Sequence, residues 1–235
     1  MLKAQCSMNL RSLIKKTFLY RHIYQPYRVK REKADANRKH AIFVQHGAEV
    51  LVRFAKCMQE EGLDYWLEFG TLLGAYRDGA FVPNELDLDV GAYLRDASRI
   101  HQALAQKGFR LVREFHVIGE DNMEQTYEYE GVTLDVMYFV QKDGQMWCYG
   151  AFYDPWRCPL DKPFYHQITA HYFKPFSLGK LTFLGTEMKV PANTEEHLME
   201  IFGMGYKVYD PDFKGDLNKI FYAWEEKSGI GFIKY

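Results

Sequence analysis

Apolar and polar positions divide the first half of the chain into alternating helical and strand-like segments. Helical spacing of apolar residues predicts a long helix over residues 36–62. Period-two alternation predicts strands over 65–69 and 86–93, with a short helix over 71–79 between them. A further helix is expected over 95–108. The order helix, strand, helix, strand, helix therefore opens the main part of the protein.

Strand-like alternation dominates the second half, and a helix follows it. The predicted strands are separated by turn signals that contain glycine or asparagine. A helix is expected over 193–203. The pattern indicates an α+β fold: a mixed sheet flanked by helices, with an antiparallel extension and a helical C-terminal part. The four predicted strands are 109–118, 124–130, 132–140 and 145–153.

Composition fits a globular protein in a reducing compartment. The chain has 235 residues, 47% of them hydrophobic, which is enough to bury one domain-sized core. Its four cysteines form no CxxC pair, so we interpret them as free thiols. A zinc site is an alternative, although the spacings match no familiar zinc pattern. The residues concerned would be Cys148, Cys158, His166 and His171.

Charge divides the chain into a basic head, residues 1–36, and a domain, residues 37–235. Residues 1–40 contain eleven Lys or Arg against two acids, and the remainder carries 19 basic against 29 acidic residues. Residues 10–24 have the pattern of a basic interfacial helix that could rest on an anionic membrane. A solvated helix packing on the body, or a partly disordered tail, are equal alternatives. Nucleic acid is not an expected partner, because the acidic body would repel phosphates.

Neither a membrane span nor a signal peptide is expected from the sequence. No segment approaches the roughly 20 apolar residues that a spanning helix needs. Near the N-terminus, Arg11, Lys15 and Lys16 interrupt the apolar run that a signal peptide requires. We therefore expect a cytoplasmic protein, peripheral to the inner face of a membrane if the head binds there.

Carboxylates occupy one face of a strand that is otherwise apolar. In "ELDLDV", residues 85–90, Glu85, Asp87 and Asp89 alternate with apolar residues and so share one face. Carboxylates at this spacing repel, which favours a hard divalent cation between them. Asp135 lies in another apolar strand, "VTLDVMYF", where an unpaired charge is costly. The sequence predicts Mg²⁺ (or Mn²⁺) at Asp87, Asp89 and Asp135. Alternatively, the first two lie on a solvated face and Asp135 pairs with an arginine.

Two segments resemble the LicD and fukutin-related family of phosphotransferases. "FGTLLGAYRDGAFVPNELDLDVG", residues 69–91, matches the family pattern of GTLLGxxR, a short spacer, a proline and an acidic DxD segment. "LTFLGTEMKVPANTEEHLMEIFGMGY" resembles the family's C-terminal strand, VP and helix. The resemblance covers roughly residues 62–210. The sequence departs from the family at Asn84 and Glu85, which often are tryptophan and aspartate, and at Leu86, which replaces another acid.

This resemblance implies a nucleotidyltransferase-like fold and roles for further residues. The aspartates named above would bind magnesium. Gly70 and Thr71 would hold phosphate oxygens through the turn, and Arg77 would contact a diphosphate. Glu68 would orient a substrate or Arg77.

The implied reaction is a transfer from a CDP-activated donor. A phospho-linked group, such as phosphocholine or an alditol phosphate, would pass to a sugar hydroxyl of a capsule, lipopolysaccharide or other cell-surface glycan. Asp135 or a neighbour would accept the hydroxyl proton. The acceptor would be a glycan or a lipid-linked oligosaccharide. Alternatives are a nucleotidyltransferase that transfers NMP to a small molecule or sugar, and a non-catalytic binding subunit. A glycosyltransferase fits less well, because it does not require GTLLG and the arginine.

Overall fold

The computed structural model describes most of the chain from residue 24 onwards. His22 is described as well, whereas the rest of the predicted helix over 10–24, apart from Tyr24, lies outside the described residues. Contacts divide the chain into two units, Met1–Ala41 and Ile42–Tyr235, and each is treated by itself. The described residues are 22, 24–117, 123–151, 164–165, 168–210, 219–221 and 230–234.

Helix α2 (Gln25–Glu60) begins eleven residues before its predicted start. Pro26 is favourable in a first turn, because the backbone N–H groups there need no partner within the helix. An ion pair of 3.1 Å between Arg28 and Glu32, one turn apart, adds support. The first buried residue of the helix is Phe43. None of the described helices combines the length and the apolar content that crossing a bilayer requires.

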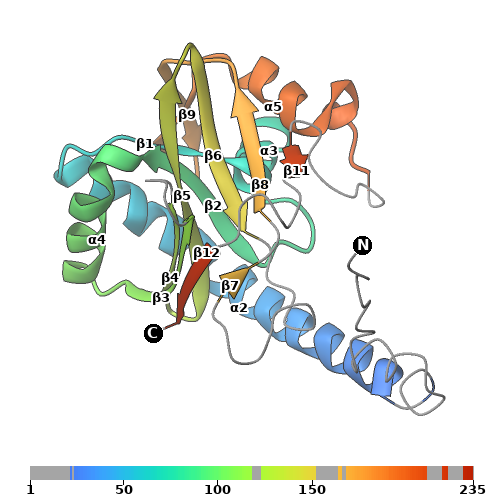
Figure 1. Ribbon diagram of the computed structural model, residues 1–235. Coiled ribbons are helices and arrows are strands. Elements are labelled where there is room, and N and C mark those ends of the chain that lie inside the picture. Colours follow the sequence, from blue (N-terminus) through green and yellow to red (C-terminus); the bar gives the residue numbers. More distant parts are fainter. Residues whose placement is uncertain are drawn as a thin grey trace, which may run out of the picture. The chain divides into compact units, whose positions relative to one another are not determined.

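A mixed sheet forms the centre of the second unit (Figure 1). Strands β2 and β5 are parallel neighbours, whereas β1 pairs antiparallel with β2, β4 with β5, and β3 with β4. All five correspond to predicted strands, and the predicted α+β class is confirmed. The strands are β1 (Tyr65–Leu67), β2 (Asp87–Tyr93), β3 (Arg110–Val117), β4 (Met123–Tyr129) and β5 (Val132–Lys142).

The predicted antiparallel extension begins where β5 passes beyond β2. The end of β5 pairs with β6, β6 with β8, and β8 with β11. At the other edge, β12 pairs with both β3 and β7, while β9 and β10 form a separate hairpin. These strands are β6 (Gln145–Ala151), β7 (Phe164–Tyr165), β8 (Ile168–Phe173), β9 (Leu178–Phe183), β10 (Thr186–Pro191), β11 (Lys219–Phe221) and β12 (Ile230–Lys234).

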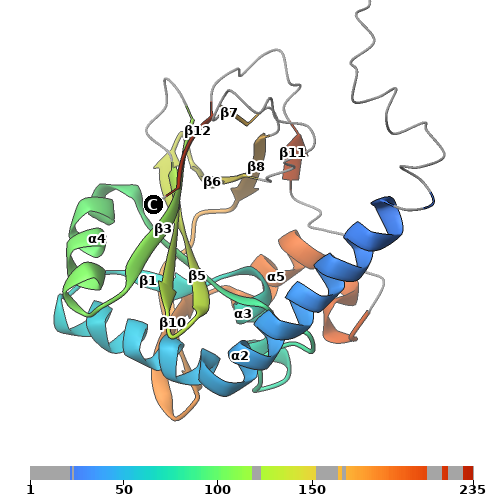
Figure 2. The same ribbon diagram turned by 90° about the horizontal axis from the view of Figure 1, so that it is seen from below.

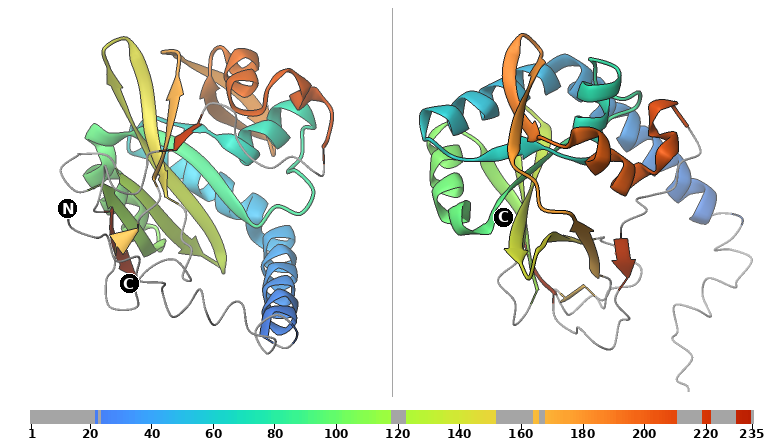
Figure 3. Two further views of the ribbon diagram at one scale, coloured as in Figure 1. Left: turned by 45° about the vertical axis from the view of Figure 1, so that its right-hand side comes forward. Right: turned by 90° about the horizontal axis from the view of Figure 1, so that it is seen from above.

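Helices lie on both sides of the central strands. Figure 2 shows α4 and residues 42–60 of α2 along the same side of β1, β3 and β5. Helices α3 and α5 contact each other and appear together at one end of the sheet in Figure 3. The remaining helices are α3 (Phe69–Arg77), η2 (Leu94–Asp96), α4 (Ala97–Gln106), α5 (Thr194–Phe202) and η3 (Met204–Lys207).

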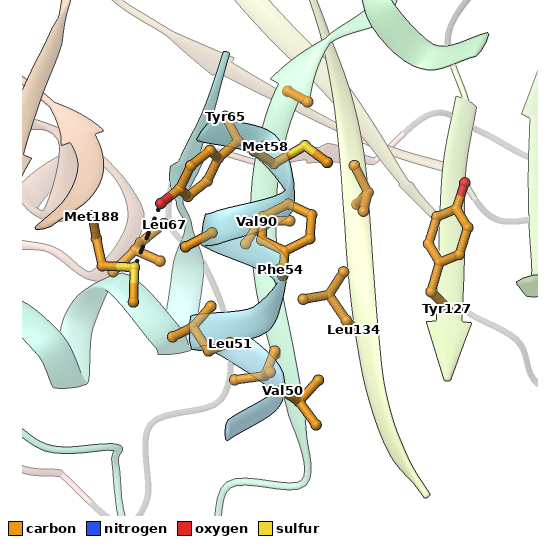
Figure 4. Close-up of a cluster of buried hydrophobic side chains, with 14 of the residues drawn as sticks. Val50, Leu51, Phe54, Met58, Tyr65, Leu67, Val90, Tyr127, Leu134 and Met188 are labelled. Carbon is orange, nitrogen blue, oxygen red and sulfur yellow. Dashed lines mark hydrogen bonds between the residues drawn. The ribbon is translucent and has the colours of Figure 1, made fainter. Parts of the chain in front are cut away.

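The main core fills the space between α2 and one face of the sheet. Figure 4 shows Val50 and Phe54 of α2 with Val90 of β2 and Leu134 of β5, all fully buried. Alternation along a strand directs even-numbered residues of β2 and β5 to this core. The odd-numbered residues, including Asp89, therefore face the opposite side of the sheet.

The opposite face carries its own aromatic cluster, in which Gly91 is essential for packing. Gly91 of β2 lies opposite Trp66 of β1, and a Cβ on Gly91 would lie 2.3 Å from the Trp66 ring. Trp66 is fully buried, with its ring centroid 5.2 Å from Tyr93 and 5.0 Å from Phe139. The indole therefore has no space into which it can retreat without disturbing this cluster.

We expect Gly91→Ala to lower the free energy of unfolding by about 2 kcal/mol, because the added methyl group overpacks the Trp66 cluster. Urea denaturation followed by tryptophan fluorescence measures the change. Gly205→Ala is a matched control, because a Cβ there meets nothing within 4 Å. Equal stabilities for the two variants would contradict the packing role of Gly91.

Candidate active site

Sheet register places the predicted carboxylates side by side. Asp89 of β2 pairs directly with Asp135 of β5 in the parallel ladder. Neighbouring strands lie about 4.8 Å apart, so these two residues are adjacent on the same face. Asp87 lies two residues before Asp89 on that face. The structure thus brings together the three aspartates that the sequence singled out.

Electrostatic repulsion accompanies this arrangement. The pKa of Asp89 is raised well above its usual range, first by burial of the carboxyl group and then by the negative charges of Asp87 and Asp135. Burial, followed by the charge of Asp87, raises the pKa of Glu85 to about 7. A bound cation would relieve this repulsion.

The Glu85 pKa predicts how stability depends on pH in the metal-free protein. Because the folded state binds the Glu85 proton more tightly than the unfolded state, stability falls as pH rises from the ordinary value of 4.5 to about 7. We expect Glu85→Gln to reduce this fall. Melting temperatures measured in EDTA between pH 4.5 and about 7 test this expectation. Parallel curves of melting temperature against pH for wild type and variant would contradict it.

The start of α3 holds the backbone of Asp89. The Asp89 N–H donates to the Thr71 hydroxyl at 2.9 Å, and the Glu68 N–H donates to the Asp89 carbonyl at 3.1 Å. Between them, Phe69 adopts a left-handed φ of 41°, which costs a non-glycine residue about 1–2 kcal/mol. Strain of this kind concentrates at functional sites.

Gly70 lies in the first turn of α3 and faces the carboxylates. A Cβ on Gly70 would lie 2.9 Å from Glu85 Oε2 and 3.7 Å from Asp89 Oδ2. A side chain at this position would therefore have to displace the Glu85 carboxylate. Thr71 has a different position from the one expected of a phosphate ligand, because its side chain is buried and its hydroxyl accepts from Asp89. The Thr71 side chain positions Asp89, whereas phosphate contact through the first turn stays a proposal.

The partners of Glu68 differ from the predicted ones. Glu68 is fully buried and accepts hydrogen bonds from Trp66 Nε1 at 2.7 Å and from the Phe69 N–H at 3.3 Å. Its Oε1 lies 2.7 Å from Nε2 of His197. The sequence suggested that Glu68 orients a substrate or Arg77, whereas its carboxylate is directed into this buried network and caps α3.

His197 of α5 is a residue that the sequence reasoning missed. It is fully buried, stacks on Phe173 with ring centroids 4.4 Å apart, and contacts Phe176 at 5.1 Å. Among the described residues, no hydrogen-bond partner reaches its Nδ1. The available signal was its place beside Leu198 on the apolar face of α5, a position that more often indicates an ordinary core histidine.

A pocket of about 310 Å³ adjoins the carboxylates at Gly70 and Glu85. Arg77, the predicted diphosphate contact, lines this pocket, but much of its guanidinium is already bonded. Its Nε and Nη2 donate to Asp78 at 2.8 and 2.6 Å, and its Nη1 donates to the Tyr206 carbonyl at 3.2 Å. The lining residues are Gly70, Leu73, Arg77, Val82, Pro83, Glu85, Phe202, Gly205, Tyr206, Val208, Tyr209 and Asp210.

The carboxylate oxygens of this site suit Mg²⁺ that is bound through only a few protein ligands. Asp135 pairs with an arginine, which is the alternative that the sequence also allowed. Arg113 Nη2 lies 3.3 and 3.4 Å from the two carboxylate oxygens of Asp135, and the Thr126 hydroxyl donates a hydrogen bond to the same carboxylate. Over the described residues, no group of three or more His, Cys, Asp or Glu is arranged as a ready metal site. Mg²⁺ usually needs only one or two carboxylates, together with water and substrate phosphates. Asp87 and Asp89 fit that requirement.

Two of the four residues of the zinc alternative lie on neighbouring strands. Cys148 and His171 are direct partners across β6 and β8, and both are buried. Cys158 and His166 lie outside the described residues. Within the part of the chain that is described, Cys57 and Cys148 are both buried.

The mixed sheet, the glycine-containing start of α3 and the paired aspartates on β2 define a domain of the nucleotidyltransferase class. Comparison with known families agrees, because residues 62–193 match the family described as LicD/FKTN/FKRP, nucleotidyltransferase domain. The match covers more than half of the chain, which therefore belongs to this family.

Curated relatives include transferases from mammals. The ribitol-5-phosphate transferase FKTN of Homo sapiens is 28% identical over 177 residues, which cover 74% of this chain and 36% of that protein. The ribitol 5-phosphate transferase FKRP of Homo sapiens is 30% identical over 154 residues, covering 63% of this chain and 29% of that protein. The chain spans about a third of the length of these relatives.

A solved structure is also similar, the lincomycin-bound lincosamide antibiotic adenylyltransferase LnuA. It aligns with a TM-score of 0.42 and 18% identity, over 69% of this chain and 89% of that one.

Proposed function

We propose that this protein transfers a phosphate-linked group from a CDP-activated donor to a sugar hydroxyl of a cell-surface glycan, with Mg²⁺ or Mn²⁺ as cofactor. Family membership supports a phosphotransferase, and the names of the mammalian relatives point to an alditol phosphate, ribitol 5-phosphate, as one candidate for the transferred group. Phosphocholine is the other candidate that the resemblance implies.

The observation that carries this proposal is the pairing of Asp89 with Asp135 beside the start of α3. A structural role alone does not explain why neighbouring strands would place carboxylates against each other at a cost in repulsion, as the raised pKa of Asp89 indicates. Asp87 and Asp89 would hold the cation, which when bound supplies charge neutralisation for the donor diphosphate. The first turn of α3, at Gly70, directs its positive end towards the same place.

Proton transfer would accompany attack by the acceptor. The acceptor oxygen forms a bond to the phosphorus atom of the transferred group while the bond from that phosphorus to the CMP oxygen breaks. Asp135 or Glu85 would take the hydroxyl proton. Glu85 suits this role because a base with a pKa of about 7 is effective near neutral pH. Most of the remaining catalysis would come from positioning.

The 310 Å³ pocket would hold the donor nucleotide. Gly70 and Glu85 line the pocket and also lie beside the carboxylate site, where the diphosphate would lie. Tyr209, which is 47% exposed, offers aromatic surface for a pyrimidine, and such stacking contributes about 1–3 kcal/mol per base. Arg77 lines the same pocket and is our candidate for contact with the donor phosphates.

The basic head would bring the enzyme to a glycan growing on a lipid carrier at the inner membrane face. In its described part, Lys30, Arg31 and Lys33 of α2 are exposed, and Tyr27 is 62% exposed. Each basic residue near an anionic surface contributes about 1 kcal/mol. Binding of the full chain to vesicles that contain phosphatidylserine, compared with a chain lacking residues 1–36, tests this step. Unchanged binding after the deletion would overturn it.

Donor and cofactor can be tested together on the full chain. We would measure thermal stabilisation by CDP-ribitol, CDP-choline, CDP-glycerol and CMP, each with and without Mg²⁺. Stabilisation by one CDP compound that requires Mg²⁺ supports the proposal and identifies the donor. Absence of any shift with cytidine nucleotides in a folded protein would favour a non-catalytic role or another nucleotide.

Nucleotidyl transfer by the same site is the remaining alternative. Mass spectrometry of the acceptor product separates the two reactions, because nucleotidyl transfer adds NMP whereas the proposed reaction adds phosphocholine or an alditol phosphate. A product that carries NMP would overturn the proposal.

A further inference from the structure

A straight row of residues crosses four neighbouring strands at the proposed site. Arg113 of β3 lies opposite Thr126 of β4, Thr126 lies opposite Asp135 of β5, and Asp135 lies opposite Asp89 of β2. The positively charged Arg113 lies at one end of the row, and the candidate metal ligand Asp89 lies at the other.

Hydrogen bonds connect the first three members of this row. Arg113 Nε donates to the Thr126 hydroxyl at 3.0 Å, and Thr126 in turn donates to Asp135. Arg113 Nη2 lies within 3.4 Å of both Asp135 oxygens and 3.7 Å from Glu124. The guanidinium is also 4.8 Å from the Phe115 ring centre, which fixes its position. The side chain of Asp135 is thus held towards β3.

We propose that Arg113 is a positioning residue that competes with the divalent cation for Asp135. This inference rests on the proposed function, because it assumes that Asp87 and Asp89 bind a cation. The guanidinium of Arg113 neutralises the Asp135 carboxylate to which it is bonded. Its positive charge also repels a divalent cation that approaches Asp89. Arg113 thereby limits the affinity for the cation and keeps Asp135 from becoming a permanent metal ligand.

Binding of Mn²⁺ alone, measured by electron paramagnetic resonance of the free ion, tests the competition without any need for turnover. Arg113→Met removes the charge and is expected to lower the Kd for Mn²⁺ about tenfold. Arg113→Lys keeps a positive charge near Asp135, so its Kd should stay within about threefold of wild type. Arg110→Met is the matched control, because Arg110 lies on the same strand but forms an exposed 2.9 Å ion pair with Glu128.

The outcomes separate this inference from the proposed function. A wild-type protein that binds no Mn²⁺ would contradict the proposed metal site itself. If wild type binds Mn²⁺, a Kd that Arg113→Met leaves unchanged or raises would show that the competition is wrong. A raised Kd would show that Arg113 instead orients Asp135 as a ligand. A Kd for Arg113→Lys as low as that for Arg113→Met would also overturn it, because the charge would then have no effect.

A second measurement uses unaltered protein, in case Arg113→Met does not fold. Modification of arginines by phenylglyoxal, followed by fragment mass spectrometry, reports how accessible each guanidinium is. Because the cation should displace Arg113 from Asp135, saturating Mn²⁺ is expected to accelerate modification of Arg113 several-fold and to leave Arg110 unchanged. Equal or slower modification of Arg113 would overturn the proposal.

Discussion

Replacing Asp89 with asparagine is expected to lower the rate of transfer about a thousandfold, equivalent to ~4 kcal/mol of lost transition-state stabilisation. Asp89 lies at the centre of the site, with Asp135 beside it and its backbone fixed by Thr71 and Glu68. Asparagine preserves the shape of the side chain but removes the charge that would hold the cation. Release of CMP from the donor measures the loss.

The same substitution should stabilise the metal-free protein. Because the pKa of Asp89 is raised, its ionised form is unfavourable in the folded state at neutral pH. Asp89→Asn should therefore increase the free energy of unfolding in EDTA by about 1 kcal/mol. Asp143→Asn is the control, because Asp143 is exposed in the turn after β5. This substitution should change neither the rate of transfer nor the free energy of unfolding. Loss of both activity and stability in Asp89→Asn would point to a structural role instead.

His197→Ala is expected to lower the free energy of unfolding by about 3 kcal/mol. His197 and Glu68 are both fully buried, so removing the imidazole leaves Glu68 Oε1 without its 2.7 Å partner in an environment that water does not reach. Stacking of the imidazole on Phe173 is lost as well. Chemical denaturation with matched m-values measures the change.

A second substitution separates hydrogen bonding from packing. His197→Phe retains an aromatic ring against Phe173 but cannot bond to Glu68, so it should recover less than about 1 kcal/mol of the loss. His46→Ala, at a half-buried position of α2, should cost at most about 1 kcal/mol. Stability close to wild type for His197→Phe would show that the histidine acts only by filling space.

The pairing of β2 with β5 was predictable because both strands carry an acid within an apolar run. Alternation in "ELDLDV" placed Asp87 and Asp89 on one face, and the cost of burying Asp135 suggested a partner nearby. The register, which sets Asp89 against Asp135, is a property of the assembled sheet. No local pattern specifies it, because strand pairing depends on residues far apart in the sequence.

Residues that act through distant partners were not predictable in this way. Arg113 stands in an alternating strand where an arginine ordinarily faces solvent, and its contact with Asp135 arises only when β4 separates the two strands. His197 meets Glu68 across 129 residues of sequence. Arg77, predicted to contact a diphosphate, lines a pocket, but the pocket wall that contains Tyr206 lies beyond the predicted helices.

The pocket and the carboxylates are built from different kinds of structure. Asp87, Asp89 and Asp135 belong to central strands whose positions the whole core determines, whereas the pocket walls come largely from two segments outside the sheet. These are the connection 82–85 and residues 202–210, which include the end of α5 and η3. Substitutions in those two segments can reshape the pocket with little effect on the sheet. Because we propose that the donor binds in this pocket, we expect an exchange of residues 204–210 to change donor preference while the carboxylates keep their positions.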